Sequence, residues 1–149
     1  VYNYLKALEN AYILSKIQRF DIKGKAILET MEKFYLTDLG FRHAKLGYRA
    51  NDIAGYLENI VYLELLRKKY TVNIGKLKTK EVDFIGTYLD QKLYIQVTYL
   101  LASKETIERE FSPLREIEDN YPKYVLSMDQ IGEYNIDGII RKKITDFLL

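Results

Sequence analysis

Four polar side chains are spaced so that local structure would bring them close together. Glu58 lies in a helical pattern, whereas Asp83, Gln96 and Thr98 lie in alternating patterns typical of strands. If residues 89 and 90 form the tip of an antiparallel hairpin, Asp83 faces Gln96 at a Cβ separation of roughly 5 Å. Carboxylate and amide oxygens can bind hard divalent cations, or such groups can satisfy one another by hydrogen bonding.

The elements that must position these groups are one helix and two strands. Residues 53–69 place Ala54, Leu57, Val61 and Leu65 on one apolar stripe, with Glu58 at its margin. In residues 93–99, odd-numbered positions face one side and even-numbered positions the other. The same alternation sets Val82 and Phe84 opposite Asp83 and Ile85. We therefore expect Asp83, Gln96 and Thr98 to share one face.

The order of elements after residue 52 indicates an α/β fold. The helix is followed by strands at 70–74, 82–88 and 93–99, a helix at 106–119 and a strand at 123–127. Pro113 marks either a kink in the second helix or a start capped by Ser112. Residues 139–149 contribute a short strand or turn and a final helix. The resulting α-β-β-β-α-β order predicts a mixed sheet flanked by helices.

Residues 1–42 predict a helix followed by a β-hairpin. Tyr4, Leu8 and Tyr12 belong to a helical stripe, and Gly24 separates short apolar runs as a turn would. This is the back half of a winged helix, or else a hairpin that merely packs on the next domain. The chain starts without Met, so we expect a fragment with units at 1–42 and 52–149. Residues 42–51 read as a polar link containing the single histidine, His43, to which we assign no role.

Composition narrows the classes of function. The chain has 149 residues, 48% of them hydrophobic, which is sufficient for a core. It has no cysteine, so disulfides, thiolate metal sites and thiol catalysis are excluded. The net charge of +2 does not by itself indicate a nucleic-acid partner. No apolar run reaches membrane-spanning length, and we expect a soluble cytoplasmic protein with no membrane partner.

The element order, together with an acid in the first helix, an aspartate in the second strand and a polar pair in the third, resembles the PD-(D/E)XK nuclease fold. More closely, the chain is similar to the C-terminal, DUF4143-type region of a prokaryotic family of AAA+ ATPases. Six segments carry this second resemblance: 35–40 (YLTDLG), 55–65 (GYLENIVYLEL), 81–84 (EVDF), 95–97 (IQV), 108–110 (ERE) and 121–123 (YPK).

The nuclease resemblance implies roles for individual residues. In active members, the aspartate and a second strand acid hold Mg²⁺ or Mn²⁺, the helix acid assists, and a lysine handles water or phosphate charge. Glu58 and Asp83 match this pattern, whereas Gln96 replaces the second acid and Thr98 replaces the lysine. The resemblance thus predicts a degenerate site. The alternative is an active nuclease in which Asp83 and Gln96 bind metal and a displaced lysine assists; the candidates are Lys76, Lys78, Lys80 and Lys92.

The ATPase resemblance implies partners for this chain. In that family, an ATPase domain with a phosphate-binding loop precedes this region. The chain contains no G-x-x-x-x-G-K-[ST] motif, so ATP would bind in the missing N-terminal part. The implied partners are the protein's own ATPase domain, DNA, and further copies in an oligomer. A module that docks or oligomerises the ATPase without touching nucleic acid is the competing hypothesis.

A run of cations supplies the candidate nucleic-acid surface. Six basic residues occur before the next acid, Glu81, and Tyr62, Tyr70 and Tyr88 flank the run. The six are Arg67, Lys68, Lys69, Lys76, Lys78 and Lys80. They could line a groove for a phosphate backbone, or form a solvated face that blocks edge pairing. The charge-rich helix near residues 105–119 is expected to expose its charged face.

Overall fold

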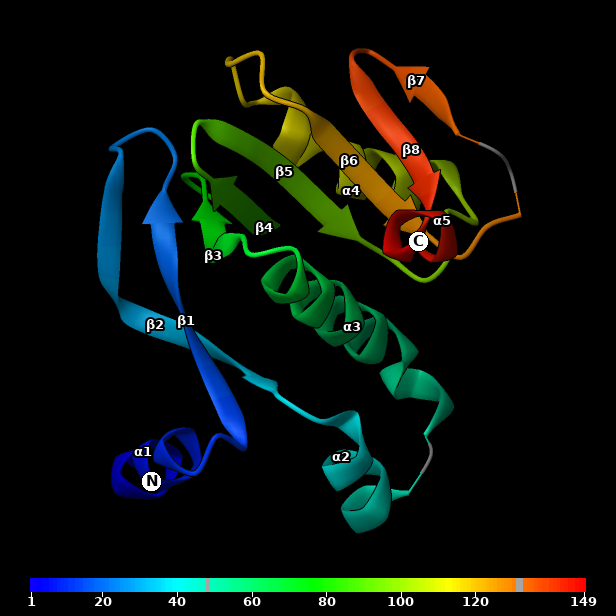
Figure 1. Cartoon of the computed structure of the whole chain (residues 1–149). Helices are drawn as coiled ribbons and strands as arrows, with labels where there is room; N and C mark the ends of the chain where they lie inside the picture. The colour runs from blue at the N-terminus through cyan, green and yellow to red at the C-terminus, as the bar shows by residue number, and fades with distance from the viewer. Residues whose placement is uncertain (48, 131–132) are drawn as a thin grey trace.

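The computed structural model describes residues 1–47, 49–130 and 133–149, without the side chains of residues 30, 31 and 50. It is an α/β structure built on one mixed sheet of eight strands in the order β2-β1-β3-β4-β5-β6-β8-β7 (Figure 1). The strands are β1 (Leu14–Asp21), β2 (Ala26–Leu36), β3 (Thr71–Lys76), β4 (Glu81–Tyr88), β5 (Gln91–Val97), β6 (Lys123–Ser127), β7 (Tyr134–Ile136) and β8 (Ile139–Lys143). The helices are α1 (Tyr2–Asn10), α2 (Leu39–Leu46), α3 (Ile53–Arg67), α4 (Lys104–Arg115) and α5 (Ile144–Leu148).

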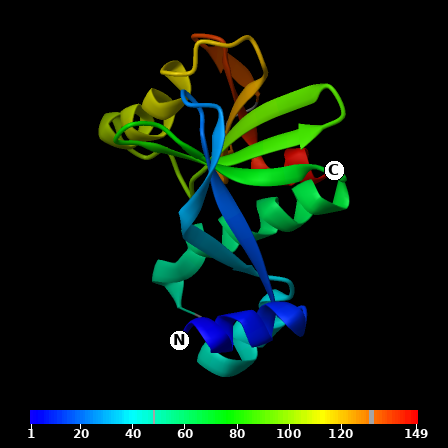
Figure 2. The same cartoon turned by 90° about the vertical axis from the view of Figure 1, so that its left-hand side faces the viewer.

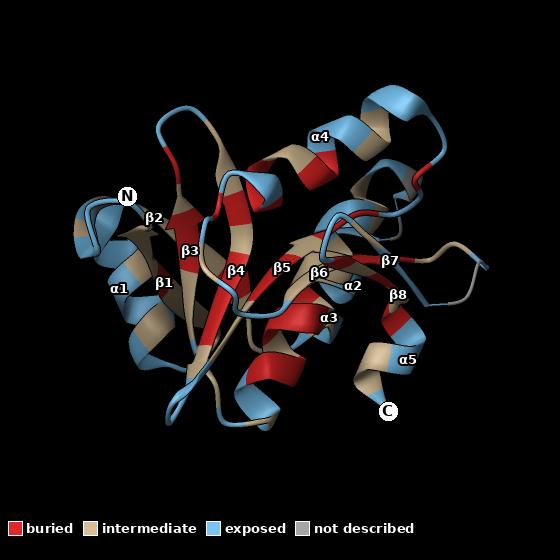
Figure 3. Cartoon of the chain, turned by 90° about the horizontal axis from the view of Figure 1, so that it is seen from above, coloured by how far each residue is buried: buried red, intermediate tan, exposed pale blue. Residues whose placement is uncertain are grey.

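The two faces of the sheet carry separate apolar cores. Helices α3 and α5 cover one face, and α4 covers the other (Figures 1 and 3). The α3-side core includes Val61, Leu65, Ile74, Phe84 and Ile95. The α4-side core includes Val82, Ile85, Tyr94, Phe111 and Leu114. The predicted mixed sheet flanked by helices is therefore confirmed.

The β4–β5 hairpin has the predicted register. Phe84 pairs with Ile95, and Tyr88 pairs with Gln91, so Leu89 and Asp90 form the tip. Leu89 has a φ of 51°, in the left-handed region that tight turns use. The alternation within β5 is also confirmed, because Ile95 joins the α3-side core and Tyr94 joins the α4-side core.

The N-terminal helix and hairpin are present as predicted. The turn between β1 and β2 is held by Asp21, whose Oδ1 accepts the N–H groups of Lys23 and Gly24 at 3.0 Å each. The hairpin does not stand alone, since β1 pairs in parallel with β3, with Arg19 opposite Ile74. Figure 2 shows the hairpin extending from the sheet toward α1 and α2. Residues 1–42 and the α/β part thus share one sheet.

Some predicted element boundaries are wrong. The polar link contains helix α2 and a 3-10 turn, Ala50–Asp52, while residue 48 lies outside the described residues. Helix α4 begins after Ser103, whose Oγ accepts the Thr106 N–H at 3.1 Å, and Pro113 lies near its end. Ala54 is exposed rather than part of a buried stripe. Strand β7 was not anticipated, because three residues show no periodicity.

None of the helices within residues 1–47, 49–130 and 133–149 combines the length and apolar character needed to cross a bilayer.

Candidate functional site

Asp83 lies at a bulge in β4. Opposite β3, Val82 pairs with Gly75 and Ile85 pairs with Asn73, so β4 uses one residue more than its partner strand. Such a bulge redirects side chains and often occurs beside functional sites. Here it puts Val82 in the α4-side core but Phe84 in the α3-side core. The expectation that Val82 and Phe84 share a face is therefore wrong, and Asp83 is the residue at which the strand changes face.

Asp83 and Gln96 meet where the β4–β5 ladder ends. Beyond the Phe84–Ile95 pair, the Asp83 N–H donates to Gln96 Oε1 at 3.2 Å. The Val97 N–H donates to Asp83 Oδ2 at 2.8 Å. These side-chain bonds replace the next step of the backbone ladder. The single oxygen of the Gln96 side chain and one oxygen of the Asp83 carboxylate thus each accept a backbone N–H.

Glu58 approaches Asp83 from the α3 side and is held by β2. Its Oε1 accepts close hydrogen bonds from Lys33 Nζ and from the Tyr35 hydroxyl. Burial, reinforced by the Glu58 charge, raises the pKa of Tyr35. Lys33 therefore supplies a cation to the network, whereas the sequence analysis names Lys76, Lys78, Lys80 and Lys92 as candidates. Alternation within residues 33–36 would have put Lys33 and Tyr35 on one face, but nothing in the sequence indicates that this face meets α3.

The Asp83 carboxyl is electrostatically unusual. Burial raises its pKa, and the charges of Glu58 and Glu110 raise it further, whereas the Val97 N–H and Lys33 lower it. The balance raises the pKa of Asp83 to about 7. Glu58 acts from α3 and Glu110 from α4, so Asp83 feels negative charge from both sides of the sheet. The Asp83 carboxyl is therefore far easier to protonate than an ordinary aspartate.

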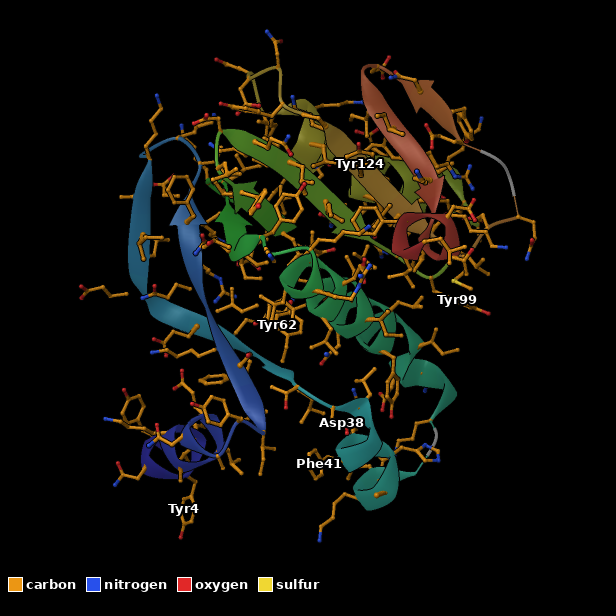
Figure 4. The ribbon with its side chains drawn as sticks, in the orientation of Figure 1. Tyr4, Asp38, Phe41, Tyr62, Tyr99 and Tyr124 are labelled. Carbon is orange, nitrogen blue, oxygen red and sulfur yellow. The ribbon has the colours of Figure 1, made fainter. Side chains whose placement is uncertain are left out.

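Residues around Glu58 fasten β2 to α3. Asn59 Oδ1 accepts the Leu36 N–H at 2.9 Å, and Asn59 Nδ2 donates to the Leu36 carbonyl at 2.8 Å. Tyr35 stacks on Tyr62 with ring centroids 4.8 Å apart, and Tyr62 lies on the hairpin side of α3 (Figure 4). The surroundings of Glu58 are therefore well packed and hydrogen-bonded.

The predicted metal ligands, Asp83 and Gln96, lie apart from the acidic side chain of Glu58. Tyr94 belongs to the α4-side core, so alternation assigns Gln96 to that face, whereas Glu58 lies on the α3 side. Within the described ranges, no three His, Cys, Asp or Glu side chains are grouped to hold a metal. Thr98 is buried just beyond β5, and its backbone N–H donates to the Leu126 carbonyl. Asp83 and Gln96 thus supply one carboxylate and one amide oxygen, without the second acidic ligand that the metal of an active nuclease takes in the resembled fold.

The predicted cation run is divided between two places. Arg67, Lys68 and Lys69 lie at the end of α3, whereas Lys76, Lys78 and Lys80 lie at the far end of β3 and in the turn to β4. Glu64 binds Arg67 at 2.7 Å and Lys68 at 3.2 Å, and the hydrogen bond from Arg67 lowers the pKa of Glu64 despite its burial. The six cations do not line a single groove.

A second turn adds cations to one half of the run. The Ile22 N–H donates to the Lys76 carbonyl at 3.0 Å, so the β1–β2 turn lies beside the β3–β4 turn. We call the five lysines in these two turns and at the end of β3 the turn cluster: Lys23, Lys25, Lys76, Lys78 and Lys80. Lys80 binds Glu116 at 2.6 Å, and this hydrogen bond lowers the pKa of Glu116, which the charges of Lys80 and Lys23 lower further. Lys76 lies 3.5 Å from Glu81.

The charged helix α4 is not wholly exposed. Glu110 is buried, and its Oε1 pairs with Arg109 at 2.8 Å. The expectation that this helix exposes its charged face is wrong at Glu110. The negative charge of Glu110 contributes to the raised pKa of Asp83.

Comparison with known proteins finds no matching family model. An uncharacterized protein of Haemophilus influenzae is 39% identical over 146 residues, which cover 98% of this chain and 36% of that protein. An uncharacterized protein of Methanocaldococcus jannaschii is 31% identical over 156 residues, which cover 98% of this chain and 32% of that protein. The chain thus spans about a third of the length of the curated relatives it matches.

Proposed function

We propose that this chain is a nuclease-like domain that binds nucleic-acid backbones without cleaving them. The observation that carries the proposal is the use of the would-be ligand oxygens inside the protein. Gln96 Oε1 accepts the Asp83 N–H, Asp83 Oδ2 accepts the Val97 N–H, and Glu58 binds Lys33 and Tyr35. Because cleavage of this type requires free oxygens converging on a metal, such a network favours a degenerate site.

The proposed architecture is PD-(D/E)XK-like, with the back half of a winged helix before it. Helix α3, the antiparallel strands β3, β4 and β5, helix α4, and strand β6 parallel to β5 follow the order expected for that nuclease fold. Helix α1 and the β1–β2 hairpin supply the winged-helix part. The whole would form the DUF4143-type C-terminal region of an AAA+ ATPase-like protein, whose ATP would bind elsewhere in the longer chain.

The turn cluster is the proposed contact with nucleic acid. Lys23, Lys25 and Lys78 are exposed, and they extend from neighbouring turns at one end of the sheet. Lysine side chains on such turns can approach successive phosphates, and counterion release then makes binding salt-dependent. Arg67 and Lys68 are a weaker choice because both pair with Glu64.

The test is fluorescence anisotropy of labelled single- and double-stranded DNA with the whole chain. We expect binding that weakens by a factor on the order of ten to a hundred between about 50 and 200 mM salt. Lys78→Glu should weaken binding several-fold. Lys69→Glu is the matched control, since Lys69 is also exposed but lies at the other end of β3. Incubation of the same DNA with Mg²⁺ or Mn²⁺ should leave it intact.

Two outcomes would contradict the proposal. Metal-dependent cleavage that disappears in Asp83→Ala would establish a working nuclease, in which the network around Asp83 rearranges to admit metal. Absence of salt-sensitive binding to either form of DNA would favour a module that docks or oligomerises the ATPase.

A further inference from the structure

An open apolar hollow lies between α2 and the base of the β1–β2 hairpin. Its volume is about 470 Å³, and Leu14, Leu36, Phe41, Arg42, Lys45 and Leu46 line it. Phe41 is 55% exposed and Leu46 is 51% exposed. In Figure 4, Phe41 projects from α2 on the side toward α1. Two large apolar side chains of one short helix therefore lack a cover within the described chain.

Helix α2 is short and buries none of its described residues. It has eight residues, and its N-terminus is capped by Asp38, which accepts the Gly40 N–H at 2.7 Å. Helices this short are marginal in water and normally gain stability by packing an apolar face. Figure 3 shows α1 mostly in the colour of exposed residues, unlike α3, and most described residues of α2 are exposed as well.

The rim of the hollow has one sign of charge. Helix α2 carries Arg42 and Lys45 and has no acidic residue between Leu39 and Leu46. Arg42 is partly neutralised by Asp52 at 2.5 Å, so Lys45, which is exposed, dominates the rim. A complementary partner would present apolar side chains to the hollow and acidic side chains to Lys45, as an amphipathic helix in a groove does.

We infer that this hollow receives an amphipathic helix with an acidic flank, supplied by the polypeptide outside this region in a longer protein. In both relatives, about two thirds of the chain lies outside the matched part, so a covering segment is available there. This contact is independent of the turn cluster, which lies at the opposite end of the hairpin.

The test uses synthetic peptides that tile the Haemophilus influenzae relative outside its matched region, labelled and titrated with the whole present chain. We expect an acidic amphipathic peptide to bind, and Phe41→Glu to weaken its binding at least tenfold. Lys45→Glu should weaken binding of the same peptide and leave the circular-dichroism melting curve of the chain unchanged. Tyr4→Glu is the matched control, because Tyr4 is an aromatic residue of α1 that is 79% exposed and lies outside the hollow.

Three outcomes would overturn the inference. The first is that no peptide binds, and the second is that Phe41→Glu and Tyr4→Glu affect binding equally. The third is concentration-dependent self-association in sedimentation experiments that Phe41→Glu abolishes, since the occupant would then be a second copy of this chain.

Discussion

At the scale of single residues, Asp83 should make the free energy of unfolding depend on pH. Its pKa in the folded protein is about 7, above the usual value near 3.9 for an unfolded chain. The folded state therefore binds more protons than the unfolded state between these values. Asp83 consequently lowers the free energy of unfolding most above pH 7, and this loss is relieved as the pH falls toward 4.

Replacing Asp83 with Asn should therefore stabilise the protein in alkaline solution. An Asn oxygen can still accept the Val97 N–H, but no charge is buried. We expect Asp83→Asn to exceed the wild type in free energy of unfolding by a few kcal/mol at pH 8, roughly following 1.4 kcal/mol per pKa unit. The difference should shrink at pH 5, and urea denaturation at both values measures it. An equal difference at both values would contradict the raised pKa.

Two buried tyrosine hydroxyls should respond oppositely to removal. The Tyr35 hydroxyl donates to Glu58, so Tyr35→Phe should lower the free energy of unfolding by about 1 to 3 kcal/mol. The Tyr56 hydroxyl is buried without a hydrogen-bond partner among the described residues, so Tyr56→Phe should be neutral or stabilising. Thermal or chemical denaturation compares the two variants. Similar losses of free energy of unfolding in both variants would mean that the hydrogen bond from Tyr35 to Glu58 does not stabilise the fold.

At the scale of elements, Asn59 is the clamp between β2 and α3. Asn59→Ala removes two hydrogen bonds and leaves the N–H and carbonyl of Leu36 without these partners. We expect a loss of about 2 to 4 kcal/mol in the free energy of unfolding. Asn73→Ala is the control, because Asn73 makes one long bond of 3.4 Å to the Gln18 carbonyl and should cost less than about 1 kcal/mol. Urea denaturation measures both variants, and equal losses in free energy of unfolding would contradict a special role of Asn59.

Elements governed by local rules were predictable from the sequence, and elements governed by distant pairing were not. The β4–β5 register follows from a two-residue tip and strict alternation, and strand β6 coincides with the predicted residues 123–127. The bulge at Asp83 depends on how β4 meets β3, which no local pattern specifies. Lys33 was missed for the same reason, since its partner Glu58 belongs to another element.

At the scale of the whole molecule, the hairpin contributes to the core of the sheet. Ile17 and Tyr35 belong to the α3-side core, and β1 covers the edge of β3. We expect residues 52–149 alone to lose cooperative unfolding, because this core and the β3 edge would be exposed. A chain lacking residues 1–11 should retain it, since α1 buries none of its described residues. Circular-dichroism melting measures both.

A cooperative transition in residues 52–149 would instead support two independently folding units, as the sequence-based division predicts.

The run of six cations shows why the arrangement of the whole molecule is hardest to infer from sequence. Six nearby cations suggested one surface, but an intervening strand separates Lys69 from Lys76 and leaves each group near different acids.

The parallel pairing of β1 with β3 also bears on the order in which the chain can fold. During synthesis, the β1–β2 hairpin leaves the ribosome before β3. The edge of β1 that pairs with β3 therefore has no partner while α2 and α3 are made. The β4–β5 hairpin closes over a short loop, whereas joining Arg19 to Ile74 closes a long one. We therefore expect the β1–β3 pairing to form later than the β4–β5 hairpin, which leaves the β1 edge open to other strands in the meantime.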